Sequence, residues 1–151
     1  AEERLSFDVQ LEMARRMGAL PVNATKESVV DAVKKVAGRK GGADAIIELS
    51  GAPEVYDYIF EILRLEGRIV TVGHVSRPIS VNISKQVNLK GVSLKGVFGR
   101  RIWETWEHLS SLVAAKRIDL SGVVTHRFPL EGFEDAFRQV HGEAGKVLFV
   151  P

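Results

Sequence analysis

The sequence of 151 residues contains no cysteine. A disulfide, a zinc site made of thiolates and a cysteine nucleophile are therefore excluded within this chain. The sequence also lacks an apolar run long enough to cross a membrane. Its polar beginning, AEERLSFD, does not have the apolar segment of a signal peptide. We expect a cytoplasmic protein without a membrane partner.

A strong charge of one sign is also missing, because 21 Lys and Arg residues face 19 Asp and Glu residues, for a net charge of +2. Residues 100–108 do combine basic and aromatic side chains, a mixture that single-stranded nucleic acids favour. Two glutamates interrupt this segment, however, and its tryptophans fit the buried side of a helix. We therefore expect no nucleic-acid partner.

Several catalytic and phosphate-binding motifs are absent. The sequence has no GxGxxG, no Walker loop, no GxSxG and no HExxH. Its four histidines do not stand at the spacing of metal ligands, and only one of them, His74, follows a predicted strand; the others are His108, His126 and His141. We predict no catalytic residue and no metal ligand in this chain.

The composition is that of a globular protein, with 45% apolar and 26% charged residues. Ala43 to Leu49 is apolar at nearly every position, which is typical of a strand buried on both faces of a parallel sheet. A helix beginning near Pro53 is expected to run to about Leu65 and to end before Gly67, and Arg68 to Val72 forms a second buried strand. This strand–helix–strand order predicts an α/β fold with a mainly parallel sheet.

The remaining elements follow from periodicity and capping signals. Helices are expected over 8–17, before Gly18, and from a cap at Thr25, with Ser28 as the poorer alternative, to Gly38. The apolar residues of the helix over 101–116 should be buried. Weak strands are expected over 20–23 and 79–83, and an edge strand at Val92 to Phe98. The tail repeats strand, helix, strand over 124–128, 130–140 and 146–150, with the helix's phenylalanines buried.

The carboxyl ends of the predicted strands carry the candidate site, because open α/β sheets bind ligands at that edge. Ser50–Gly51, Gly73–His74 and Gly99–Arg100 follow the three strands, and a glycine lets a ligand approach the backbone closely. The alternative, that these glycines only end strands, remains open. We expect Gly51 and Gly73 to lie within about 10 Å of each other. A large side chain at either position should then obstruct a flat ligand. The residues alone indicate an α/β domain that could bind a nucleotide.

Six segments in order resemble one family, the zinc-type medium-chain alcohol dehydrogenases. They are LEMARRMGA (11–19), GADAIIELSGAPE (42–54), LEGRIVTVG (65–73), LKGVFGRRIWE (94–104), THRFPLEGFEDAF (125–137) and GKVLFV (145–150). The threonine dehydrogenase branch is most similar and the polyol dehydrogenases are next. The resemblance covers the chain from about residue 11 to the end.

The resemblance implies a partial Rossmann fold, doubly wound and mainly parallel, over residues 1–100. Residues 101–151 would be the helix and the C-terminal segment that returns to the catalytic domain. It also implies that three turns line the nicotinamide and ribose of NAD or NADP: Ser50, Gly51 and Ala52; Val72, Gly73 and His74; Val97, Phe98, Gly99 and Arg100. The partners would be a small-molecule alcohol and a second subunit paired along Val92 to Phe98.

The departures from the family pattern are as informative. The family's glycine-rich loop, its first strands and the domain that holds zinc should precede residue 1. The acid that selects NAD has no clean position in AEERLSFD. We therefore expect zinc to belong to the complete enzyme and not to this chain, and this chain alone to be inactive. The alternative is a truncated, non-catalytic module for dimerisation or nucleotide binding.

Overall fold

The computed structural model describes the backbone of residues 2–140 and 144–151, and the side chains from residue 8 onward within those ranges. The chain forms two compact units. We call residues 24–100 the sheet unit, and residues 1–23 together with 101–151 the terminal unit. The predicted domain division, 1–100 and 101–151, stays a prediction about the complete protein.

The sheet unit contains a three-stranded parallel sheet, in the order β1-β2-β3. The strands are β1 (Ala43–Glu48), β2 (Leu63–Thr71) and β3 (Ser93–Gly96). In the register, Glu48 stands beside Thr71, and Thr71 stands beside Gly96. All three strands therefore end at the same edge, and the predicted α/β fold with a parallel sheet is confirmed.

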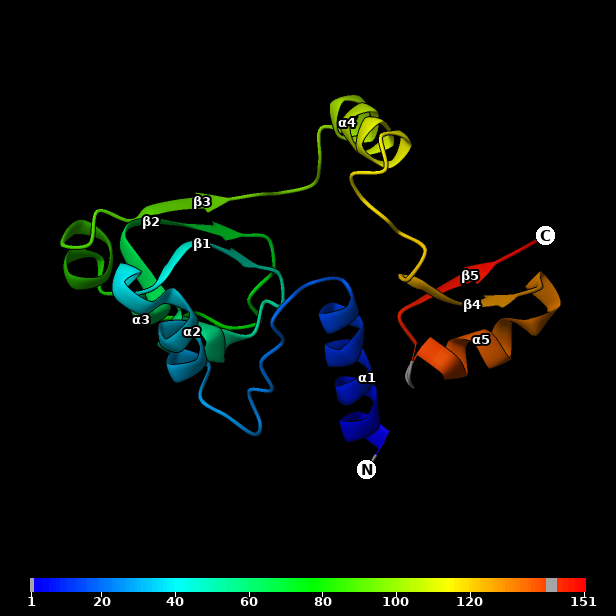
Figure 1. The fold of residues 1–151 in the computed structure, drawn as a ribbon, viewed down its shortest axis with the longest axis horizontal. Helices are drawn as coiled ribbons and strands as arrows, with labels where there is room; N and C mark the ends of the chain where they lie inside the picture. Colours follow the sequence, from blue (N-terminus) through cyan, green and yellow to red (C-terminus); the bar gives the residue numbers. More distant parts are fainter. Residues whose placement is uncertain (1, 141–143) are drawn as a thin grey trace. The chain divides into compact units, whose positions relative to one another are not determined.

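One face of this sheet holds the core. The helices α2 (Val29–Ala37) and α3 (Ile59–Ile62) lie on the same side of it (Figure 1). The largest fully buried side chains are Ile59, Leu63 and Ile69. The prediction that β1 is buried on both faces is wrong, because Ile47 on the other face is 65% exposed. Successive side chains of a strand point to opposite faces, and the helices of this unit cover only one.

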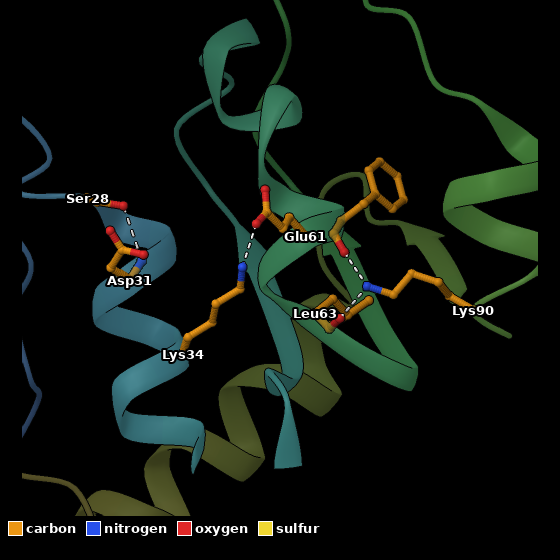
Figure 2. A network of polar contacts seen from close by, with 7 residues as sticks. Ser28, Asp31, Lys34, Glu61, Leu63 and Lys90 are labelled. Atoms are coloured by element: carbon orange, nitrogen blue, oxygen red, sulfur yellow. Dashed lines mark hydrogen bonds and ion pairs between the residues drawn. The ribbon is translucent and has the colours of Figure 1, made fainter. Parts of the chain in front are cut away.

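Helix α2 begins at a different cap from the one we favoured. Ser28 Oγ accepts a hydrogen bond of 3.2 Å from Asp31 N (Figure 2). Thr25, in contrast, lies in a turn three residues earlier. A side-chain oxygen at this position satisfies a backbone N–H that the helix cannot satisfy itself. The helix is followed by a short 3-10 helix, η1 (Gly38–Lys40).

The connection from β1 to β2 holds less helix than predicted. It consists of the 3-10 helix η2 (Pro53–Asp57) and of α3, and β2 begins at Leu63. Figure 2 shows why the helix ends early: Lys90 Nζ donates to the carbonyl oxygens of Phe60 and Leu63, at 2.5 and 2.6 Å. A cation is stabilised at a helix C-terminus by the exposed carbonyl groups.

The first part of β2 is irregular. The register shifts between Ala43 and Ala45, and Glu66 has a left-handed φ of 56°. Regular pairing resumes at Arg68, where the sequence predicted the strand to begin. Gly67 therefore lies inside β2 and does not end a helix. The two helices are joined by an ion pair between Lys34 and Glu61, which Figure 2 also shows.

The segment between β2 and β3 contains no strand, so the weak strand predicted over 79–83 is wrong. A π-helix, η3 (Ile83–Asn88), occupies the last part of this segment. The Asn82 side chain caps this helix by accepting a hydrogen bond from Lys85 N. Ile79 and Val81 pack against the core instead of pairing with a strand. The edge strand is also shorter than the predicted Val92 to Phe98.

The terminal unit contains α1 (Glu2–Arg16), α4 (Ile102–Ala114), β4 (Val124–Phe128), η4 (Leu130–Gly132), α5 (Phe133–Val140) and β5 (Lys146–Phe149). Strands β4 and β5 are parallel, and α5 lies beside them (Figure 1). The predicted helices and the strand–helix–strand tail are confirmed. The weak strand over 20–23 is wrong, because those residues have no regular structure.

The predicted burial of two apolar helix faces in this unit is also wrong. Trp103 and Trp106 of α4 are 79% and 51% exposed, and the phenylalanines of α5 are exposed as well. Ala136 is the buried residue of α5. Periodicity predicted both helices correctly, but a two-stranded sheet offers too little surface to bury their larger apolar side chains.

The cap of α2 can be tested with two matched substitutions. Ser28→Ala should lower the free energy of unfolding by about 1 kcal/mol, because it leaves a backbone N–H of the first turn without its acceptor. Ser80→Ala, at an exposed serine outside the helices and strands, should change it by less than about 0.5 kcal/mol, as for an ordinary surface position. Denaturant unfolding of the two variants measures both values. An equal loss in the two variants would contradict the cap seen here.

Candidate functional site

The candidate site is formed by three turns at the carboxyl edge of the sheet. Ser50–Ala52 follows β1, Val72–His74 follows β2, and Val97–Arg100 follows β3. Val72 N and Gly73 N both donate to the carbonyl oxygen of Glu48, at 2.8 and 3.1 Å. The backbone thus ties the second turn to the end of β1, two residues before the first turn.

The first two turns touch at their glycines. A Cβ on Gly73 would collide with Gly51 N, and would stand 2.8 Å from the Glu48 Oε2 atom. A Cβ on Gly51 would collide with the carbonyl oxygen of His74. Gly51 also has a left-handed φ of 67°, which favours glycine. The expected closeness of Gly51 and Gly73 is therefore confirmed.

The contact explains why glycine is required at positions 51 and 73, and this explanation differs from the one we expected. A side chain at either position would meet the chain's own backbone before it met a ligand. The expectation that a larger residue there would chiefly obstruct a ligand is therefore wrong. Its first effect would be to separate the two turns.

Glu48 organises the first turn, and the sequence analysis missed it. Its Oε1 atom accepts from Ser50 Oγ at 2.6 Å, from Ser50 N at 2.8 Å and from Gly51 N at 2.9 Å. The residue is only 3% exposed. The available signal was an acid at the end of an otherwise apolar strand, just before Ser–Gly. A charge in that position needs a partner, and the nearest donors are those of the turn.

The hydrogen bonds also set the protonation of this carboxyl. Burial raises the pKa of Glu48, but the hydrogen bonds from Ser50, Gly51 and Tyr56 together lower it by more, so the net pKa lies below the ordinary glutamate value. Burial, and then the charge of Glu48, raise the pKa of Tyr56 on η2. At neutral pH the carboxylate is therefore charged and the tyrosine hydroxyl beside it is neutral.

The third turn contacts the end of β2 through a backbone hydrogen bond and the second turn through a ring contact. Val97 N donates to the carbonyl oxygen of Thr71 at 2.9 Å. The rings of His74 and Phe98 meet edge to face, with 6.0 Å between centroids, and Phe98 is 90% exposed. Gly99 follows with a φ of 64° and open space where a Cβ would stand, and Arg100 is exposed.

Other parts of the described chain are weaker candidates for a functional site. Among the residues that the structure describes, no three His, Cys, Asp or Glu side chains lie together in a way that could hold a metal ion. His126 stacks on Phe128, and His141 lies outside the described residues. So do the side chains of residues 1–7, where an acid that selects NAD was sought.

The terminal unit has an open depression of about 950 Å³ between α1 and residues 117–125. Its acids are already engaged: Glu12 pairs with Arg15 and Arg16, and Asp119 accepts from Ser121 N. The arginines beside Glu12 lower the pKa of that carboxyl. Nothing there points to a ligand, so we place the candidate site at the sheet edge.

Comparison with known proteins identifies the family. A sequence model of the family described as zinc-binding dehydrogenase matches residues 6–115. The chain belongs to this family. The L-threonine 3-dehydrogenases of Bacillus velezensis and of Shewanella sp. are 32% and 34% identical to it, over 95% and 93% of this chain and 42% and 41% of theirs. The chain thus spans less than half the length of these curated relatives.

Solved structures agree with this assignment. An alcohol dehydrogenase from Thermus sp. ATN1 is 26% identical with a TM-score of 0.82, over 94% of this chain and 41% of that one. A butanediol dehydrogenase from Bacillus subtilis, at 22% identity, shares the fold with a TM-score of 0.84, over 95% and 41% of the two chains. The fold of this zinc-binding dehydrogenase chain is therefore that of the corresponding part of those enzymes. None of the helices described here is both long and apolar enough to cross a membrane; the cytoplasmic location stays a prediction.

The contact between the turns can be tested by adding one methyl group. Gly73→Ala should lower the free energy of unfolding by about 3 kcal/mol or more, because the new Cβ overlaps the backbone of the neighbouring turn. Gly96→Ala is the matched control at the end of β3, where the nearest atom to a new Cβ is Thr71 Oγ1 at 3.9 Å. It should cost less than about 0.5 kcal/mol. Equal losses in denaturant unfolding would show that the two turns do not touch.

Proposed function

We propose that the complete protein is a NAD(P)-dependent oxidoreductase of secondary alcohols, and that this chain supplies the nicotinamide side of its cofactor site. The observation that carries the proposal is the meeting of Gly51, Gly73 and His74 at the carboxyl edge of the sheet, in a member of the zinc-binding dehydrogenase family. Ligands of open α/β sheets bind at this edge.

The residues present fit the nicotinamide end of such a cofactor. The carboxylate of Glu48 is buried against Gly73, and the exposed His74–Phe98 ring pair stands at the same edge. Ser50, Gly51 and Ala52, Val72, Gly73 and His74, and Val97 to Arg100 would form the surface against the nicotinamide and its ribose. When bound, NAD(P) supplies the acceptor of the hydride.

The residues present do not fit zinc, since the described chain brings no suitable set of ligands together. We therefore assign the metal to another part of the complete protein and assign no step through it to this chain. The role of this chain is to orient the cofactor and to exclude water from beneath it. The threonine 3-dehydrogenase relatives support threonine as the first alcohol to try, with polyols next.

The proposed function makes two linked predictions. The full-length protein should reduce NAD or NADP in the presence of threonine, a polyol or a simple secondary alcohol, followed by the absorbance of the reduced nucleotide. The polypeptide of these 151 residues, supplied with zinc, should show no activity, because it lacks a metal ligand set in its described part. Activity in this polypeptide would overturn the proposal that another part of the complete protein holds the metal. A full-length protein that neither turns over nor binds any nicotinamide nucleotide would overturn the function itself.

We also propose that subunits pair along β3. This strand is at the edge of the sheet, and an edge strand offers unpaired backbone groups to another chain. Leu94 is 49% exposed and Phe98 is 90% exposed, which supports an apolar contact. Val92 is only 9% exposed and packs into the core, so it belongs to the folded unit and not to the contact.

The pairing is tested by Leu94→Lys. A lysine on the edge strand should shift the sedimentation of the full-length protein toward a smaller species, because it opposes the approach of a second strand. Leu65→Lys is the control, since Leu65 is also exposed (63%) but lies in the irregular start of β2. An unchanged oligomer in Leu94→Lys would place the interface elsewhere.

A further inference from the structure

The carboxylate of Glu48 is buried at the contact between the first two turns. Its Oε1 atom accepts three short hydrogen bonds from Ser50 and Gly51, whereas its Oε2 atom is closed to solvent and makes no such short contact. The neutral hydroxyl of Tyr56 donates toward this carboxylate from η2. Oε2 lies beside Gly73, so the buried carboxylate borders the contact that forms the candidate site.

The charge of this carboxylate is also not neutralised. None of the ion pairs found in the described part of the chain includes Glu48. Hydrogen bonds, and not a neighbouring cation, keep its pKa low. Buried charges in proteins are normally paired, because removing a charge from water is costly. An unpaired one at the edge of a sheet therefore suggests a positive partner that binds there.

The same residue holds both turns. Its side chain accepts from the Ser50–Gly51 turn, and its carbonyl oxygen accepts from Val72 N and Gly73 N. Any displacement of Glu48 would therefore move both turns.

We propose that Glu48 is a positioning residue of the candidate site, and that its buried charge shifts the preference of the site toward the oxidised nicotinamide ring, which is positively charged, and away from the reduced ring, which is neutral. This inference rests on the proposed function. A charge beneath a surface with little water acts more strongly than one in solvent, and salt screens it less. The preference should therefore survive at high ionic strength.

Four substitutions separate the charge from the hydrogen bonds. Glu48→Gln keeps the length of the side chain and one acceptor oxygen but removes the charge. Glu48→Asp keeps the charge but shortens its reach, and Ser50→Ala keeps the charge but removes the donor at 2.6 Å. Glu54→Gln is the matched control, because Glu54 is nearby in sequence but 70% exposed and paired with Arg77.

The decisive experiment measures, by calorimetry on the full-length protein, the Kd of the oxidised and of the reduced form of the nucleotide that binds. Glu48→Gln should reduce the preference for the oxidised form by roughly three- to tenfold, the size of effect expected for one shielded charge. Glu48→Asp and Ser50→Ala should weaken both forms and keep the preference. Glu54→Gln should change neither. Equal weakening of both forms in Glu48→Gln would overturn the electrostatic part.

A second measurement needs no variant at the carboxylate. In the parent protein, the preference for the oxidised form should be constant above the pKa of Glu48 and decrease as the pH falls toward it. Tyr56 is the titratable side chain facing the carboxylate from η2, and it stays neutral in this range because its pKa is raised. His74, on the neighbouring turn, directs its ring to Phe98. A preference for the oxidised form that increases as the pH falls would contradict the proposal.

The positioning role is tested without any cofactor. Because the pKa of Glu48 is lower in the folded chain, its ionisation stabilises the fold above the ordinary glutamate value of about 4.3. This stabilisation is lost as the pH falls through the folded pKa. Glu48→Gln should therefore flatten the dependence of unfolding free energy on pH between about 3 and 6, and amide exchange at Gly51 should become faster. An unchanged pH profile and unchanged exchange would overturn the positioning role.

The nucleotide-binding measurements test the ring preference, and the stability measurements test the positioning role. If the parent binds no nicotinamide nucleotide, the proposed function and the ring preference fail together. A flattened pH profile in Glu48→Gln would still establish that the carboxylate positions the turns. If the parent binds the nucleotide but Glu48→Gln leaves the preference unchanged, the proposed function stands and the ring preference is overturned.

Discussion

Two loops that leave neighbouring parallel strands can share one small space only if neither brings a side chain into it. Gly51 and Gly73 meet this condition, and the buried carboxylate of Glu48 lies against Gly73. The contact depends on the register of β1 and β2, which places Glu48 beside Thr71. The position of the candidate site therefore follows from strand pairing, whereas its shape follows from one buried charge and two glycines.

The sequence was informative where a local pattern decides the outcome. Strand ends followed by glycine predicted that the turns at Ser50–Gly51 and Gly73–His74 would meet at one edge, because parallel strands end together. The role of Glu48 was not predictable with the same rule. Its importance comes from three donors on the next turn and from the backbone of β2, and these contacts exist only in the folded sheet.

The errors about burial in the sequence analysis share a physical cause. Hydrophobic periodicity shows that a face is suited to burial, but not which element covers it. Ile47 and Trp103 are exposed for this reason, although the strand and the helix that carry them were correctly predicted. The helix before β2 was overestimated because its end is set by Lys90, a side chain 27 residues beyond Leu63. No pattern within the helix itself contains that information.

The central claim is that a nicotinamide ring lies over the Gly51–Gly73 contact. The most direct measurement follows the backbone amide signals of isotopically labelled full-length protein during a titration with the oxidised nucleotide. We expect Gly51, Gly73 and His74 to show the largest changes, and Gly91, which precedes β3 at the opposite edge of the same sheet, to show little change. Saturable binding that leaves the signals of Gly51 and Gly73 in place would contradict the account.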